Sequence, residues 1–368
     1  MFLDDSVRKR LLRLAPSQRT DDALYYLLAP HLLGFWTFLK PGFAGKEIGD
    51  VLFIFGDVCI IFEAKTRDKP GPTSHEWIGS KLREAVGQIK ENHRRLESGE
   101  VSTIRNPWRG ELPWSSLGIK HYQGVVVMMH ESDPYDPLAI EPSLFDSCRI
   151  PIHVLSLHDI GELMRFLNTP WDFIVYWEFR YAIGKTHALF VHKEQSVFSK
   201  ILNDWVELAR GQGAAQSDGE LLKDQQFLLN YTKAVMQSYE IDPETKRMVV
   251  ASYLIDIAAG SIMQKADPDS TGKRVGSKDH STHIKAVQLI ADLSRRRRAV
   301  YGTLWMEAAK KCIATQGESY IYGYSPSREQ SYIFCARSGL DLDEDSLSLK
   351  AKERMKLDAS SCVIVLSA

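Results

Sequence analysis

The sequence predicts an α/β protein in two parts, and two observations in the first half carry this prediction. The runs at 51–55 and 58–66 are short and almost wholly apolar, as buried strands are. Segments with apolar residues at 3.6-residue spacing alternate with such runs. We therefore expect a sheet flanked by helices in residues 1–190, and a mainly helical domain with some β-structure and no assigned role in residues 191–368.

Composition limits the class of protein. The chain has 368 residues, of which 44% are hydrophobic and 25% charged, as in a globular protein of two domains. A formal net charge of -1 excludes a uniformly basic nucleic-acid binder but allows a local basic groove. The five cysteines form no C-x-x-C pair. Without an apolar run of about 18 residues or a signal peptide, we expect a cytoplasmic protein that does not engage a membrane.

The elements of the first domain follow from local signals. A helix is expected to start at Thr20 and to end or bend at Pro30. A hairpin follows, with Gly56 first in its turn as type II′ requires. A helix at 75–98 and a strand at 123–130 are expected next. A strand that passes into a helix at 150–167 and a final helix at 169–183 complete the domain.

The second half has fewer signals. A Gly-, Ala- and Gln-rich stretch at 209–220 reads as a connection. We expect long helices and then short strands, at 221–241, 243–265 and 282–315 for the helices and at 319–324, 331–337 and 362–368 for the strands.

Charged residues stand at the edges of the apolar hairpin. Glu63 and Lys65 are two positions apart and so share one face of their strand, with Cys59 and Ile61 behind them. Asp50 opens the neighbouring strand, and the tight turn brings it back beside Glu63. Two converging carboxylates suit Mg²⁺ or Mn²⁺, and a lysine beside them can orient or deprotonate a water or stabilise charge on a phosphate. The alternative is that this Glu-x-Lys, a common triplet, is only a solvated strand end.

The stretch from Gly45 to Arg67 resembles the core of the PD-(D/E)XK nuclease superfamily, whose fold is the restriction-endonuclease-like mixed sheet flanked by helices. In that family an Asp on one strand and a Glu/Asp-x-Lys on the next hold the metal and the water. The resemblance, over about residues 15–185, implies that Asp50 and Glu63 bind the metal and that Asp50, Glu63 and Lys65 are catalytic. The family's proline before the Asp is replaced here by Gly49.

The resemblance implies two further site residues. The family often adds an acid from the preceding helix, for which Asp22 is the candidate metal ligand and Asp21 the second choice. Many members place a Gln on the helix after the Glu-x-Lys strand, which makes Gln88 a candidate catalytic residue. The Gln-x-x-x-Tyr pattern of some exonuclease members is absent, because residue 92 is Asn.

Several charged residues near this site are candidates for lesser roles. Lys81, Arg94 and Arg95 on the same helix could bind nucleic-acid phosphates, although helix charges usually form only a solvated face. The four arginines at 295–298 are a second candidate for phosphate contact. They point around the whole helix, so only some of them can face one partner. Glu84 is expected to point into solvent.

The expected function is that of a Mg²⁺- or Mn²⁺-dependent DNA endonuclease. By family habit, a role in microbial defence or restriction is expected, with a partner protein from such a system. A homodimer is the default expectation, because cutting both strands calls for two active sites. The alternative is a catalytically inactive nuclease fold that binds nucleic acid or a protein, and metal binding separates the two. A third hypothesis makes the second half a sensor that switches the nuclease.

Overall fold

The protein is described from a computed structural model. The described residues are 16–29, 34–43, 46–67, 73–106, 109–130, most of 135–182, scattered positions from 223 to 256, most of 287–315, 318–325 and 330–337. Contacts divide the chain into a first unit, Met1–Lys233, and a second unit, Ala234–Ala368. The sequence-predicted boundary at 190/191 and the predicted connection at 209–220 lie outside the described residues.

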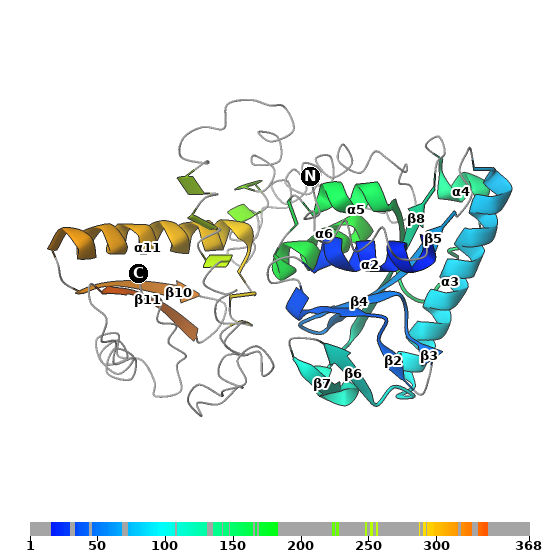
Figure 1. The fold of residues 1–368 in the computed structure, drawn as a ribbon, viewed down its shortest axis with the longest axis horizontal. Helices are drawn as coiled ribbons and strands as arrows, with labels where there is room; N and C mark the ends of the chain where they lie inside the picture. Colours follow the sequence, from blue (N-terminus) through cyan, green and yellow to red (C-terminus); the bar gives the residue numbers. More distant parts are fainter. Residues whose placement is uncertain are drawn as a thin grey trace. The chain divides into compact units, whose positions relative to one another are not determined.

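The first unit is built around a mixed sheet of five strands in the order β1-β4-β5-β8-β9 (Figure 1). β4 pairs antiparallel with β1 and β5, whereas β8 pairs parallel with β5 and β9. This confirms the predicted α/β class and the mixed sheet. The strands are β1 (Thr37–Leu39), β4 (Val51–Phe55), β5 (Val58–Thr66), β8 (His121–Met129) and β9 (Ile152–Ser156).

The predicted hairpin is confirmed as β4 and β5. Gly56 has a φ of +61°, and Asp57 is not among the residues with positive φ, as a type II′ turn requires. The pairing runs from Phe55 opposite Val58 back to Val51 opposite Phe62. Every residue of β4 is buried, and so is β5 up to its last residue, which agrees with central strands covered on both faces.

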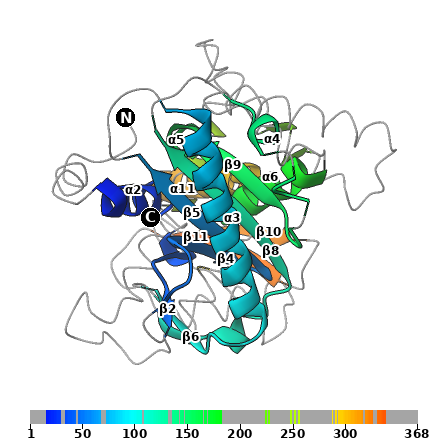
Figure 2. The same ribbon diagram turned by 90° about the vertical axis from the view of Figure 1, so that its right-hand side faces the viewer.

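Helix α3 (His75–Glu97) links β5 to β8 across one face of the sheet (Figure 2). Parallel neighbours need such a crossover connection. The Ser74 hydroxyl caps the helix by accepting a hydrogen bond from the Trp77 main-chain N–H at 3.2 Å. Its predicted apolar face is wholly buried against the sheet, and comprises Leu82, Ala85, Val86, Ile89 and Leu96.

The opposite face of the sheet carries α6 (Pro170–Ala182), where Phe173 lies 4.8 Å from Phe53 between ring centroids. Helices α2 (Pro16–Leu28) and α5 (Leu157–Leu163) contact strands of the same sheet. The predicted start of α2 at Thr20 is wrong, because the helix begins at Pro16, a residue whose fixed φ suits a first turn. Thr20 instead hydrogen-bonds Thr66 on β5.

Small elements complete the first unit. Two short antiparallel pairs are β2 (Gly42–Phe43) with β3 (Lys46–Glu47), and β6 (Thr103–Asn106) with β7 (Gly110–Pro113). A 3-10 turn η2 and a short helix α4 follow in the chain, at Trp114–Leu117 and Pro137–Ile140.

In the second unit, helix α11 (Arg295–Thr315) packs on a hairpin of β10 (Glu318–Ser325) and β11 (Gln330–Arg337). These two strands were predicted. The predicted helix at 282–315 is interrupted just before Arg295, where Ser294 accepts a hydrogen bond from the Arg297 main-chain N–H. The strand expected at 362–368 lies outside the described residues, and so does most of the two earlier helices.

Among the described residues, no helix is both long and apolar enough to cross a membrane.

Candidate active site

The hairpin geometry places Asp50 across from the end of β5. Its main-chain N–H donates to the Phe62 carbonyl at 3.0 Å, which extends the β4–β5 ladder by one residue. Its Oδ2 accepts a hydrogen bond from the Ala64 main-chain N–H at 2.6 Å. These bonds hold the Asp50 carboxyl beside the residues that flank Ala64, namely Glu63 and Lys65.

The backbone at position 49 excludes the proline that the resemblance would place there. The φ of Gly49 is +77°, a conformation that proline cannot adopt because its ring fixes φ near −65°. A Cβ at this position would also lie only 3.2 Å from Ile61 Cγ2 and 3.3 Å from the Phe62 carbonyl oxygen. The close approach to β5 that positions Asp50 therefore depends on glycine.

Glu63 and Lys65 point toward the α3 side of the sheet, as their spacing predicted. Cys59 and Ile61 lie behind them in the core cluster that includes α3. Glu63 is 4% exposed and Lys65 is 8% exposed, and 3.8 Å separates Lys65 Nζ from Glu63 Oε2. Buried charges of this kind are unusual, and the solvated-strand-end alternative is not supported.

Helix α3 contributes a polar stripe at positions i, i+4 and i+8, formed by Glu84, Gln88 and Asn92. Gln88 Oε1 accepts a hydrogen bond from Lys65 Nζ. Asn92 Nδ2 donates to Glu63 Oε1 at 2.8 Å, and Glu84 Oε1 lies 3.4 Å from Lys65 Nζ. Residues four apart project from the same side of a helix, so the stripe runs along the edge of the buried face.

The stripe contains one predicted residue and two that sequence reasoning missed. Gln88 lies where the resemblance placed it. Glu84 is exposed, as expected, with its side chain 44% accessible, but its carboxylate also lies beside Lys65 and Lys81. Asn92 was considered only because the Gln-x-x-x-Tyr pattern would need a tyrosine at that position. Its spacing of four from Gln88 could have placed it on the same side of the helix.

Helix α2 contributes Asp21 to the electrostatics of the site. Asp21 is buried, its Oδ2 lies 2.8 Å from Lys40 Nζ, and its charge acts on both Asp50 and Glu63. Successive helix residues point about 100° apart, so Asp21 and Asp22 face different directions. The described residues hold no group of three or more His, Cys, Asp or Glu placed to bind a metal, and Asp22 as a third ligand stays a prediction.

Both carboxyl groups of the pair are hard to ionise in the absence of a metal. Burial and the charge of Asp21 raise the pKa of Asp50 to about 6, against the opposing effects of the Ala64 N–H and Lys65. Burial and the charge of Asp50 raise the pKa of Glu63 to about 8. Lys65 and Asn92 favour the ionised form of Glu63 without offsetting these effects.

The donor set fits a small divalent cation. Asp50 Oδ2 accepts from the Ala64 N–H and Glu63 Oε1 accepts from Asn92, whereas Glu63 Oε2 lies 3.8 Å from Lys65 Nζ. Asp50 Oδ1 and Glu63 Oε2 would hold Mg²⁺ or Mn²⁺, with water or substrate completing the coordination. A positive ion there would also remove the repulsion that raises both pKa values.

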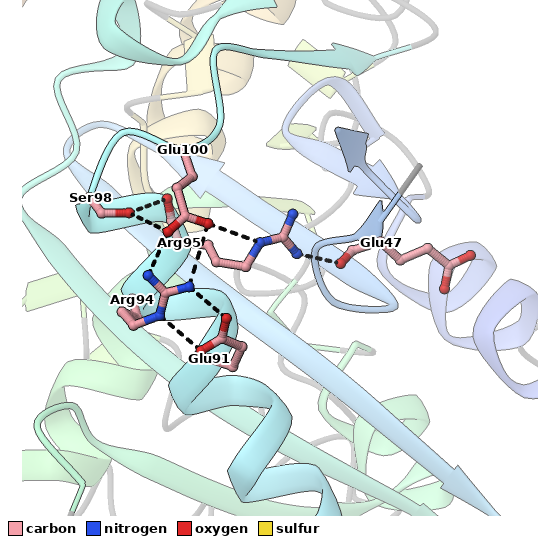
Figure 3. Close-up of polar contacts among 6 residues, drawn as sticks. All are labelled: Glu47, Glu91, Arg94, Arg95, Ser98 and Glu100. Atoms are coloured by element: carbon pink, nitrogen blue, oxygen red, sulfur yellow. Dashed lines mark hydrogen bonds and ion pairs between the residues drawn. The ribbon is translucent and has the colours of Figure 1, made fainter. Parts of the chain in front are cut away.

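The predicted phosphate-binding residues of α3 are paired within the chain (Figure 3). Arg94 makes ion pairs with Glu91 at 2.7 Å and Glu100 at 2.5 Å. Arg95 is buried and donates from Nη1 to the main-chain oxygen of Glu47 at 3.1 Å, which favours a role in holding β3 over contact with a ligand.

Lys81, the remaining predicted phosphate contact of α3, is paired within its own helix but keeps a third of its side chain exposed. Lys81 Nζ lies 2.6 Å from Glu84 Oε2 on the same helix. In the second unit, Arg295 and Arg298 are buried around Asp256, so half of the 295–298 block has a structural role.

Comparison of the chain with family models, curated proteins and solved structures finds no match.

Proposed function

We propose that this chain is a Mg²⁺- or Mn²⁺-dependent DNA endonuclease of the PD-(D/E)XK type, with a restriction-endonuclease-like core. The observation that supports the proposal best is the arrangement of Asp50, Glu63 and Lys65. The buried Glu63 carboxyl, the half-buried Asp50 carboxyl and the buried Lys65 ammonium group converge at one end of a central hairpin, although burial disfavours charge. A fold without chemistry has no need of this costly arrangement.

In the proposed mechanism, Asp50 and Glu63 hold the metal and Asn92 keeps the Glu63 carboxylate in one orientation. When bound, the ion would polarise the phosphate and acidify a water. Lys65 lies between Gln88 and the carboxylates, where its ammonium group can orient the attacking water or stabilise charge on the phosphate. Gln88 accepts from Lys65 through its oxygen, so its amide nitrogen can donate to the water or to a phosphate oxygen.

The test is cleavage by purified full-length protein of supercoiled plasmid, linear duplex, single-stranded DNA and RNA, each with Mg²⁺, Mn²⁺ or EDTA. Glu63→Gln and Lys65→Met are the site variants. Asp57→Asn, at the turn end of the same hairpin, is the matched control. The proposal predicts metal-dependent cutting of DNA by the wild type and the control but not by the site variants. Equal cutting by Glu63→Gln, or no cutting of any substrate by the wild type, would contradict it.

A second candidate function is a nuclease fold that binds nucleic acid or a protein without cutting. The observation in its favour is that the described residues hold no group of three or more His, Cys, Asp or Glu placed to bind a metal. Such a module need not bind Mg²⁺, so direct metal titration separates the two functions. A role in microbial defence and a partner protein are proposed from the family resemblance alone, and a homodimer because cutting both strands calls for two active sites.

A further inference from the structure

Lys40 has an unusual backbone conformation. It follows β1, and its φ of +41° is the only positive φ found at a non-glycine position among the described residues. L-amino acids avoid this region because their Cβ crowds the backbone, and glycine would adopt it without that cost. Residues held in such conformations cluster at functional sites, so the side chain of Lys40 calls for an explanation.

The side chain of Lys40 lies beside the proposed active site. Its Nζ is 2.8 Å from Asp21 Oδ2, and its main-chain N–H donates to the Asp50 carbonyl at 2.9 Å. The ammonium group thus lies on the α2 side of the carboxyl pair, whereas Lys65 lies on the α3 side. The charge of Asp50 interacts with both lysines.

The pairing with Asp21 leaves Lys40 able to contact a ligand. Its side chain is 28% exposed, whereas that of Lys65 is 10% exposed. An ammonium group has three N–H donors, and Asp21 Oδ2 accepts only one of them. Partly exposed ion pairs contribute little to stability, so the pair alone is a weak reason to keep a lysine in this backbone conformation.

We propose that Lys40 is a second cation of the active site, which binds a phosphate of the nucleic acid next to the one that is cut. The inference rests on the proposed nuclease function. A nucleic-acid strand whose scissile phosphate lies at Asp50 and Glu63 brings further phosphates past the edges of the pair. Lys40 is the partly exposed cation on the α2 edge, where Asp21 holds it in place. The competing account is that Lys40 only neutralises the acids around it.

The test uses full-length protein with Lys40→Gly, Lys40→Asn and Lys40→Arg. Lys120→Gln is the control, because Lys120 is exposed and pairs with Asp57 at the turn end of the hairpin. KM and kcat are measured with Mg²⁺ on a labelled DNA duplex of about 20 base pairs. Binding of the same fluorescein-labelled duplex is measured by anisotropy at several salt concentrations, with Ca²⁺ in place of Mg²⁺ to slow cleavage.

The expected result is that the glycine and asparagine variants bind the duplex about tenfold more weakly, since each loses a charge-assisted hydrogen bond. The slope of log affinity against log salt should become shallower by about one, and kcat should change less than about threefold. Lys40→Arg should retain most of the affinity. Lys40→Gly should melt no lower than the wild type, because glycine accepts the φ of this position.

Two results would overturn the inference about Lys40. One is an unchanged KM and salt slope in Lys40→Gly and Lys40→Asn, as expected for Lys120→Gln. The other is a lower kcat or weaker Mn²⁺ binding with unchanged DNA affinity, which would mean that Lys40 only neutralises the acids. If the wild type neither cuts nor binds the duplex, the proposed function fails together with this inference. If the wild type cuts, the outcome concerns Lys40 alone.

Discussion

The two units each bury a cluster of charged side chains, and the clusters have opposite balances. In the second unit, Asp256 lies 2.6 Å from both Arg295 and Arg298. Burial would raise the pKa of Asp256, but the two guanidinium groups hold it below its usual value. In the first unit, Asp50 and Glu63 have raised pKa values although Lys65 is close.

The comparison distinguishes a structural cluster from a candidate functional one. In the second unit, one carboxylate, Asp256, is paired with two guanidinium groups, and both belong to α11. The carboxyl pair of the first unit lacks positive charge, and a divalent cation would supply it. Substitutions in the first-unit cluster should therefore mainly lower activity, whereas substitutions in the second-unit cluster should mainly lower stability.

The largest effect is expected on activity. Glu63→Gln should lower the cleavage rate by about a thousandfold, because the metal loses one of its two carboxylates. Asp57→Asn should stay within about threefold of the wild type, because it lies at the far end of the same hairpin. Initial rates with Mg²⁺ check both, and equal loss in the two variants would contradict the assignment of the site.

The largest effect on stability is expected in the second unit. Asp256→Asn should destabilise that unit by about 3–5 kcal/mol, because it removes the buried carboxylate that pairs with two buried guanidinium groups. Urea unfolding followed by circular dichroism measures this. Glu307→Gln, which breaks the exposed pair with Arg247, should cost less than about 1 kcal/mol. Equal losses would remove the distinction between buried and exposed pairs.

The raised pKa values of Asp50 and Glu63 predict a pH dependence with a definite sign. A carboxyl whose pKa is higher in the folded state holds its proton longer there than in the unfolded chain. The metal-free protein should therefore lose stability as pH rises from about 4.5 to about 8. Thermal melts of the wild type against Glu63→Gln should show the variant melting higher at pH 8, and a lower melting point would contradict the raised pKa.

Metal binding should reverse this trend, because the ion binds the ionised carboxylates. The Mg²⁺ concentration that gives half-maximal activity should fall as pH rises from 6 to about 8, the interval between the two pKa values. A requirement for Mg²⁺ that does not change over this interval would show that neither proton competes with the metal.

A smaller effect is expected from Asn92, which touches the metal site only through Glu63. Asn92→Leu keeps the side-chain size but removes the donor to Glu63 Oε1, and should weaken Mn²⁺ binding about tenfold. Val86→Ala, in the apolar face of the same helix, controls for lost stability. If both variants weaken metal binding equally, Asn92 has only a structural role.

Much of the site was predictable because the hairpin is local. A two-residue turn fixes the register, and strand alternation then places Asp50, Glu63 and Lys65 together without knowledge of the rest of the fold. The positions of Asn92 and Lys40 were not predictable in this way. Each depends on how a helix packs against the sheet, which the chain determines through contacts far apart in sequence.

Two further residues show the same limit. The burial of Asp21 depends on how α2 is rotated against the sheet, which no local pattern determines. Glu84 is exposed, as helical spacing predicted, but a glutamate is long enough for its carboxylate to reach back to Lys65. Local patterns predicted the elements and their apolar faces, whereas the partners of the polar side chains required the tertiary structure.

The most direct test of the account is calorimetric titration of metal-free full-length protein with Mn²⁺. The wild type and Asp57→Asn should bind the ion, and the double variant Asp50→Asn/Glu63→Gln should lose that binding. This result would show that the chain's unbalanced carboxyl pair is a metal site. Undiminished binding by the double variant, or no binding by the wild type at millimolar Mn²⁺, would contradict the central claim.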